Sequence, residues 1–306
     1  MAEAGGVFIQ AESEISAINM VYGASAAGVR AMTSSSGPGM SLKQEGISFL
    51  AAAELPAVLV NIQRGGPGLG NIAASQADYF QAVKGGGHGD YRCIVFSPWN
   101  VQEMWDLTLR AFDKADEYRI PVILLGDGVV GQMMEPFHPT KYPGPDLPAK
   151  NWKLDGCKGR KPRVIRTLHL GDGELQNMNE RLQRKYSLIR EKEVIFDSFE
   201  TGDAGLVVVA FGIAARIALS AVIKLRRGGM KVGLFRPISL FPFPEKELRR
   251  LCVKKRFLVL EMNSGQMVED VRLAVNGKSE VLFYGRPGGI LFDPEELYLK
   301  IKAAYY

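Results

Sequence analysis

The glycine-rich loop Arg64-Gly65-Gly66-Pro67-Gly68-Leu69-Gly70-Asn71 offers the clearest binding chemistry in the sequence. Arg64 carries a planar guanidinium suited to a carboxylate or a phosphate, and glycines let the backbone approach a ligand closely. The alternative is a flexible turn with an exposed arginine. A dinucleotide fingerprint would need G-x-G-x-x-G directly after a strand, and the glycine spacing here excludes that motif.

A second candidate is Glu12-Ser13-Glu14, which joins an apolar segment at 6–10, expected to be a strand, to a helix expected over 13–29. Loops at the carboxyl ends of parallel strands are where α/β sheets place ligands. In the alternative reading, Ser13 caps the helix and Glu14 complements the helix dipole.

Two further motifs carry weaker signals. His88 lies in Gly85-Gly86-Gly87-His88-Gly89-Asp90-Tyr91, where it is a site candidate or a structural loop histidine. The pair Asp127 and Asn151 faintly imitates an Asp/Asn pair that holds Mg²⁺ and diphosphate, but prolines separate the two residues, so we interpret Asp127 as the end of a strand. The sequence shows neither a nucleophile elbow nor a metal-ligand cluster.

The elements around these loops predict an α/β fold with two domains and mainly parallel sheets. Short apolar strands alternate with helices in residues 1–130, at 31–35, 57–62, 93–97 and 121–127, and again from 201 to 306. This alternation is typical of βαβ units. Residues 131–200 are expected to form a proline-rich linker or arm followed by a charged, solvated helix over 173–196.

Composition excludes several classes of protein. The chain has 306 residues, 46% of them hydrophobic, but no apolar run long enough to span a membrane and no secretory signal. Three scattered cysteines cannot form a four-thiolate iron–sulfur site and suit a reducing cytoplasm. Residues 1–130 hold 8 Lys/Arg against 13 Asp/Glu, whereas 131–306 hold 30 against 20. Without a nucleic-acid-binding motif, we interpret the basic half as a solvated face or a subunit contact.

Long segments of the chain are similar to a known family. The run from GGVFIQAESEISAINMVYG through RGGPGLGNIAASQADYFQAVKGGGHGDY resembles the pyrimidine-binding (alpha) subunit of 2-oxoacid:ferredoxin oxidoreductases, as do GDGVVGQMMEP and FRPISLFPFPEKEL through YGRPGGI. Within that family, RGGPGLGNI and KGGGHGDY look like the branched-chain, 2-oxoisovalerate type, because the 2-oxoglutarate type usually has RGGPSTG at that place. The likeness covers almost the whole chain and is weakest at 140–195.

The resemblance implies a heteromeric enzyme that decarboxylates a 2-oxoacid oxidatively to an acyl-CoA and passes electrons to ferredoxin. It implies a thiamine-diphosphate pyrimidine-binding domain at 1–130, a linker and charged helix at 131–200, and a transketolase C-terminal-like domain at 201–306. Thiamine diphosphate and Mg²⁺ would be shared with a beta subunit, and iron–sulfur clusters would sit on a ferredoxin-like partner subunit. A gamma subunit, the 2-oxoacid and coenzyme A complete the expected partners.

The resemblance also assigns roles to residues. Glu14 matches the glutamate that activates the aminopyrimidine of thiamine, a general acid–base role, and Arg64 matches the arginine that meets the substrate carboxylate. Ser36 and Gly37 are expected beside the cofactor. Site loops are expected at Gly65, Gly66, Gly68, Gly70, Asn71 and His88.

The sequence departs from the family at its start. The family usually begins tens of residues earlier, with a strand and a Tyr-Pro-Ile-Thr-Pro-like loop, so we expect the first strand–helix unit to be missing here. This leaves a non-catalytic structural subunit, or a truncated remnant, as the alternative to an active subunit. A stand-alone nucleotide-binding protein is a third reading.

Overall fold

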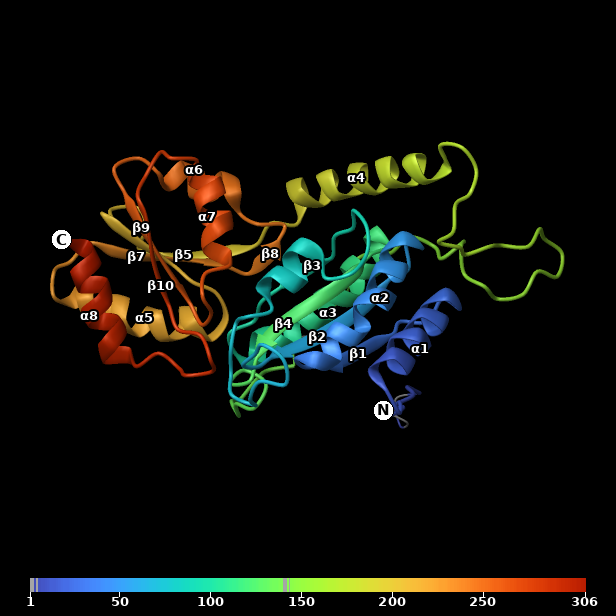
Figure 1. Cartoon of the computed structure of the whole chain (residues 1–306), viewed down its shortest axis with the longest axis horizontal. Coiled ribbons are helices and arrows are strands. Elements are labelled where there is room, and N and C mark those ends of the chain that lie inside the picture. Colours follow the sequence, from blue (N-terminus) through green and yellow to red (C-terminus); the bar gives the residue numbers. More distant parts are fainter. Residues whose placement is uncertain (1–2, 4, 140–141, 143) are drawn as a thin grey trace.

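The computed structural model describes residues 3, 5–139, 142 and 144–306. It shows an elongated molecule in which two α/β units, each a sheet with helices packed against it, lie side by side (Figure 1). We call the N-terminal unit the first layer and the C-terminal unit the second layer. A third segment arches over the first layer. Within the described residues, each helix is too short or too polar to span a lipid bilayer.

The first sheet has the strand order β1-β2-β4-β3-β8, and β1 to β4 are parallel. Its apolar strands pack under α1 and α2 and against α3, as the alternation of strands and helices predicts. The elements are α1 (Glu14–Ala26), β1 (Met32–Ser35), α2 (Pro38–Ala52), β2 (Ala57–Gln63), the π-helical turn η2 (Gln81–Gly85), β3 (Ile94–Phe96), α3 (Val101–Tyr118) and β4 (Pro121–Asp127).

The strand predicted at 6–10 is wrong. These residues have no regular structure, and Val7, Phe8 and Ile9 are 79%, 78% and 65% exposed. A strand needs a hydrogen-bonded neighbour, and within the described chain β1 pairs with β2 alone. Glu14 therefore does not follow a strand, although it still begins a helix.

The second sheet has the order β10-β9-β6-β7-β5, parallel except for β5 against β7. Figure 1 shows α6 and α7 on one side of it and α5 and α8 on the other. The elements are α4 (Glu174–Lys192), β5 (Phe196–Phe199), β6 (Leu206–Val209), α5 (Gly212–Arg227), β7 (Val232–Pro237), β8 (Ser239–Phe241), α6 (Glu245–Leu251), β9 (Arg256–Glu261), α7 (Met267–Val275), β10 (Val281–Gly285) and α8 (Pro294–Tyr305).

The connecting segment is more involved in both layers than its composition predicts. Helix α4 was expected to be solvated, but its residues Met178, Leu182, Tyr186 and Ile189 are buried in a hydrophobic core to which both sheets contribute. β5 comes from the stretch expected to be a linker and joins the second sheet. β8 comes from the second half of the chain and pairs antiparallel with β3, so that it completes the first sheet.

A buried arginine of the second layer forms an ion pair with a glutamate of the first layer. Arg236, on β7, is 1% exposed and donates to both carboxylate oxygens of Glu103 on α3, at 2.8 and 2.6 Å. Its guanidinium lies 3.9 Å from the centre of the Trp99 ring and also pairs with Asp197. Such a bidentate, stacked arrangement is specific to arginine.

Candidate functional site

The first turn of α2 is the centre of the site. Gly37 caps this helix with φ of 51°, a left-handed conformation that suits glycine, and Pro38 follows at the first helical position. The carboxyl ends of β1, β2 and β4 lie at the same edge of the parallel sheet. Ligands of α/β folds bind at this edge.

Glu14 packs against one side of this turn. Its half-buried carboxylate lies beside Gly39, where an added Cβ would stand 2.8 Å from Glu14 Oε1 and 2.2 Å from Ser35 Oγ. Glycine at this position thus leaves room for the carboxylate. The capping role considered for Ser13 is also present, because its side chain accepts from Ser16 N at 3.2 Å.

A buried cation stands near this carboxylate. Lys43, 1% exposed, donates from Nζ to Thr33 Oγ1 at 2.7 Å and to Ser34 O at 2.8 Å. Burial lowers the pKa of Lys43, and the negative charge of Glu14 opposes that shift. The Glu14 carboxylate therefore sits in the field of a fixed positive charge.

Arg64 packs against the other side of the same turn. A Cβ at Gly37 would meet Arg64 Nε at 2.7 Å, so the guanidinium lies close against the helix start. Its Nη2 has a long contact of 3.4 Å with Leu69 O, and its buried Nε has no hydrogen-bond partner within the described chain. Since Nε is buried against the α2 turn, a ligand would meet this guanidinium at its terminal nitrogens.

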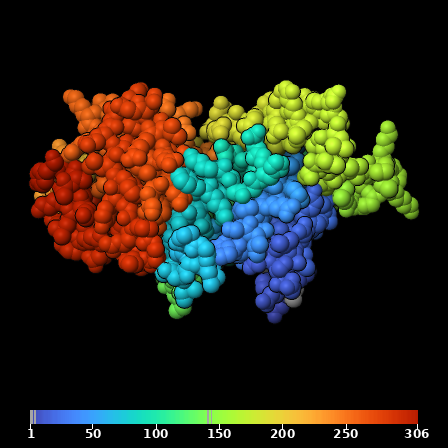
Figure 2. Space-filling model, in the orientation of Figure 1, coloured from blue at the N-terminus to red at the C-terminus, as the bar shows by residue number. Residues whose placement is uncertain are grey.

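The glycine loop after Arg64 is closed on itself and tied to the second layer. Asn71 N donates to Gly65 O at 2.9 Å, and a Cβ at Gly70 would collide with that carbonyl. Asn71 Nδ2 donates to Gly288 O at 3.0 Å. Asn71 therefore anchors the loop, and Figure 2 shows this light-blue region beside the red C-terminal half.

A cleft of about 850 Å³ lies between the α2 turn, the glycine loop and the loops that follow β9 and β10. It contains several of the residues expected from the sequence, namely Gly37, Arg64, Gly65, Gly66 and Gly68. The rest of its lining is Pro38, Ser41, Pro67, Leu69, Ala77, Asp78, Gln81, Asn263, Ser264, Gln266, Pro287 and Gly288. Other expected site residues, Glu14, Ser36, Gly70, Asn71 and His88, lie outside this lining.

The second layer also contributes to the cleft, which the sequence did not predict. Asn263, Ser264 and Gln266 follow β9, whose last residue, Glu261, is fully buried. Glu261 accepts from the backbone N–H groups of Met267 at 2.7 Å and Val268 at 2.9 Å, and so neutralises the amino end of α7. The available signal was an acidic residue at the end of an apolar strand followed by a polar turn, a pattern that is also common in structural caps.

Asp78 was also missed, although it lines the cleft near Arg64. Its Oδ2 accepts from Asn61 Nδ2 at 3.0 Å, and its backbone N–H donates to Gln63 Oε1 at 3.1 Å. Burial raises the pKa of Asp78, while the bond from Asn61 and the positive charge of Arg64 act against that rise. Asp78 is thus held in place by two side chains of β2.

His88 lies in an exposed loop away from the cleft. A Cβ at the neighbouring Gly87 would meet Gln44 O at 2.5 Å, in the second half of α2, and Gly87 N donates to the Tyr91 hydroxyl at 2.9 Å. The glycines of this loop therefore allow close packing on α2. Their geometry is that of a structural turn.

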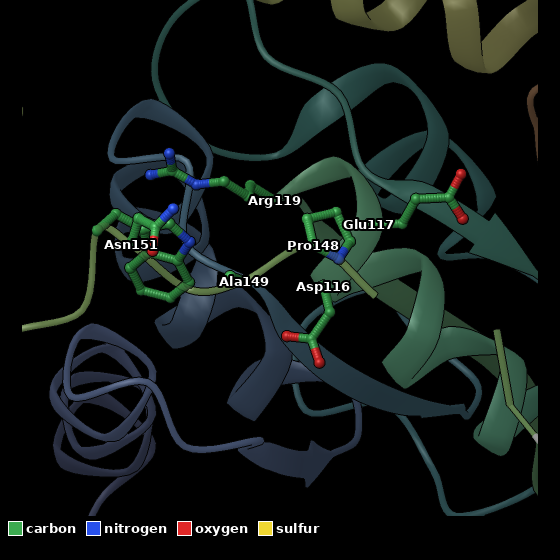
Figure 3. A pocket seen from close by; sticks show the side chains of 7 residues that line it. Asp116, Glu117, Arg119, Pro148, Ala149 and Asn151 are labelled. Atoms are coloured by element: carbon green, nitrogen blue, oxygen red, sulfur yellow. The ribbon is translucent and has the colours of Figure 1, made fainter. Parts of the chain in front are cut away.

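Asp127 and Asn151 do not form a pair. Asp127, at the carboxyl end of β4, accepts from Val129 N and Ile213 N at 3.0 and 3.2 Å. Asn151 lines a different pocket, with Asp116 and Arg119 near the opposite end of β4 (Figure 3). The interpretation of Asp127 as a strand end is confirmed, and no cluster of metal-ligating side chains is found among the described residues.

Comparisons with known proteins show the family to which the chain is similar. The family model "Pyruvate flavodoxin/ferredoxin oxidoreductase, thiamine diP-bdg" matches residues 1–180, and "Pyruvate:ferredoxin oxidoreductase core domain II" matches residues 204–297. The ketoisovalerate oxidoreductase subunit VorB of Methanothermobacter marburgensis is 52% identical over 299 residues, which are 97% of this chain and 85% of that protein.

Solved structures show the same fold. A 2-oxoglutarate:ferredoxin oxidoreductase from Magnetococcus marinus superimposes with a TM-score of 0.83 at 24% identity, over 100% of this chain and 58% of that one. A split gene transketolase has a TM-score of 0.59 at 12% identity, over 97% of this chain and 83% of that one. The predicted α/β fold with mainly parallel sheets is confirmed.

Proposed function

The chain belongs to the 2-oxoacid:ferredoxin oxidoreductase family, as a thiamine-diphosphate-dependent subunit of the ketoisovalerate type, and from this premise we propose that Glu14 activates the cofactor and Arg64 holds the substrate carboxylate. The observation that carries the proposal is the first turn of α2. Glu14 packs at Gly39 and Arg64 packs at Gly37, two residues apart on that turn. An acid–base group and a carboxylate-binding group thus flank one short stretch of backbone.

Glu14 and the residues around it fit the pyrimidine ring of thiamine. The carboxylate is half-buried, and the absence of a side chain at Gly39 leaves it accessible beside Ser35. Glu14 would hold a proton at the ring nitrogen N1′, with Ser36 and Gly37 as neighbouring contacts. When bound, thiamine diphosphate supplies the electron sink for decarboxylation of the 2-oxoacid.

Arg64 suits a 2-oxoacid carboxylate for two reasons. Its terminal nitrogens, of which Nη2 makes a long contact of 3.4 Å with Leu69 O, can form charge-assisted hydrogen bonds to a carboxylate. The amino end of α2 lies against the same guanidinium and favours negative charge. The loop glycines Gly65, Gly66 and Gly68 bring the backbone to the cleft wall.

The remaining assignments are part of the same proposal. We divide the chain into a pyrimidine-binding domain at 1–130, a connecting segment at 131–200 and a transketolase C-terminal-like domain at 201–306. The family match at 204–297 lies within the third part, whereas the match at 1–180 extends from the first part into the second. We assign the diphosphate and Mg²⁺ to a beta subunit, the iron–sulfur clusters to a ferredoxin-like subunit, and a gamma subunit to the same cytoplasmic complex. The three cysteines are free and distant in sequence, which supports placing the clusters elsewhere.

The proposal is tested in the assembled complex, purified through a tag on this chain. Glu14→Gln should slow exchange of the thiazolium C2 proton by about 10²–10⁴-fold, the usual range for general acid–base contributions. Glu12→Gln is the matched control, because Glu12 is exposed and two residues away. Exchange at the wild-type rate in Glu14→Gln would refute the role. A wild-type complex that binds the cofactor but exchanges no proton would favour the non-catalytic subunit.

A further inference from the structure

The cleft carries very little charge for a site that binds an acid. Among its lining residues, all within the described chain, Arg64 and Asp78 are the ionisable ones. With Asp78 ionised, the empty cleft is neutral, and a bound monocarboxylate leaves it with one negative charge. A dicarboxylate would leave it with two, and like charges in a confined site repel strongly.

Among the described residues that line the opposite wall, we find no second site for an anion. The amino end of α7 reaches the cleft through Ser264 and Gln266, and a helix start would ordinarily attract a carboxylate. Here the buried carboxylate of Glu261 already accepts from Met267 N and Val268 N. The start of α2, beside Arg64, has no side-chain cap, although its Gly39 and Met40 N–H groups donate to Ser36 O and Gly37 O.

One apolar side chain of the cleft lining is largely exposed to solvent. Leu69 is 80% exposed although it is a large aliphatic residue in a loop held by glycines. Prolines Pro38, Pro67 and Pro287 extend the apolar lining. An aliphatic substrate chain placed against Leu69 would be removed from water together with it.

We propose that Asp78 and Leu69 are the specificity-determining pair of this cleft, so that Asp78 rejects a second carboxylate and Leu69 receives a branched aliphatic chain. The inference rests on the proposed role of Arg64 as the site of the first carboxylate. Asp78 is suited to this task because Asn61 and Gln63 fix it in place at 3.0 and 3.1 Å. A fixed charge repels a ligand more effectively than one that can turn away.

The test compares two substrates in the assembled complex. For Asp78→Asn, the ratio of kcat/KM for 2-oxoglutarate to that for 2-oxoisovalerate should rise about tenfold or more, mainly through a lower KM for 2-oxoglutarate. Leu69→Ala should lower kcat/KM for 2-oxoisovalerate about tenfold and leave 2-oxoglutarate little changed. Asp172→Asn, an exposed residue before α4, is the matched control and should leave the ratio unchanged.

The results distinguish a failure of the proposed function from a failure of the inference about Asp78 and Leu69. A wild-type complex that oxidises no 2-oxoacid would overturn the proposed function. A complex that oxidises 2-oxoisovalerate, with an unchanged ratio in Asp78→Asn, would overturn this inference alone. If Asp78→Asn does not assemble, inhibition of the wild type decides: isovalerate should inhibit about tenfold more tightly than glutarate, and salt should reduce the difference. Equal inhibition by the two would overturn the inference.

Discussion

Replacing Arg236 should reveal how strongly the two layers depend on one side chain. Arg236→Met keeps much of the length and apolar character but removes the guanidinium that pairs with Glu103 and lies over Trp99. Breaking a buried ion pair by removing one partner destabilises a protein by about 3–5 kcal/mol. The structure favours the lower end of this range, because Glu103 keeps its hydrogen bond from Trp99 N and Asp197 is 58% exposed.

The corresponding assay is thermal unfolding of the purified chain. A loss of about 3 kcal/mol corresponds to a fall in Tm of roughly 6–12 °C for a unit of 150–250 residues. Adding Glu103→Gln to Arg236→Met should recover part of the loss, since it removes the carboxylate left unpaired. Arg184→Met, 72% exposed on α4, is the control and should change stability by less than about 0.5 kcal/mol. If Arg236→Met lowers the Tm by less than about 3 °C, or if adding Glu103→Gln recovers none of the loss, the reasoning is refuted.

Two further predictions concern binding and pH. Arg64→Lys keeps the charge but loses the planar fork, so the KM for 2-oxoisovalerate should rise about tenfold, and an unchanged KM and kcat would contradict the assignment. Although burial opposes the shift, Lys185 and Arg181 hold the pKa of Glu54 below its ordinary value of 4.5. Because the folded pKa is the lower one, this carboxylate stabilises the fold above pH 4.5 and loses that effect as the pH falls through the folded value. Glu54→Gln should therefore cost about 1–3 kcal/mol at pH 7 and progressively less on acidification, whereas a pH-independent difference in denaturant midpoint would contradict this.

Local sequence patterns predicted most of the first layer because its strands and helices are consecutive in the chain. The apolar runs at 57–62 and 121–127 become β2 and β4 within one residue of the expected ends. The strand prediction at 6–10 was wrong because an apolar segment forms a strand only beside a neighbouring strand. The local sequence does not show whether such a neighbour is present. The buried face of α4 was missed for a similar reason, since its four buried residues are outnumbered by charges along the helix.

The candidate site could be predicted where one loop carries both the motif and the chemistry, as at Arg64. It was not predictable where distant segments meet. Asp78 lies 14 residues after Arg64 in an unremarkable polar stretch, and Asn263 is brought to the cleft by the packing of the second layer. Glu14 shows the intermediate case: its place at a helix start was expected, the strand expected before it is absent from the described residues, and its neighbour Gly39 became evident from the structure alone.

The pairing of β8 with β3 has a consequence for how the chain is made. A ribosome releases residues 94–96 long before residues 239–241, so β3 must wait with one edge unpaired while more than a hundred further residues are synthesised. An open edge during synthesis is a place where nascent chains can pair with one another. The first layer is therefore completed late, when both halves have left the ribosome. If the gene were split between the two halves, the N-terminal fragment would lack the edge strand β8 until it bound the C-terminal fragment.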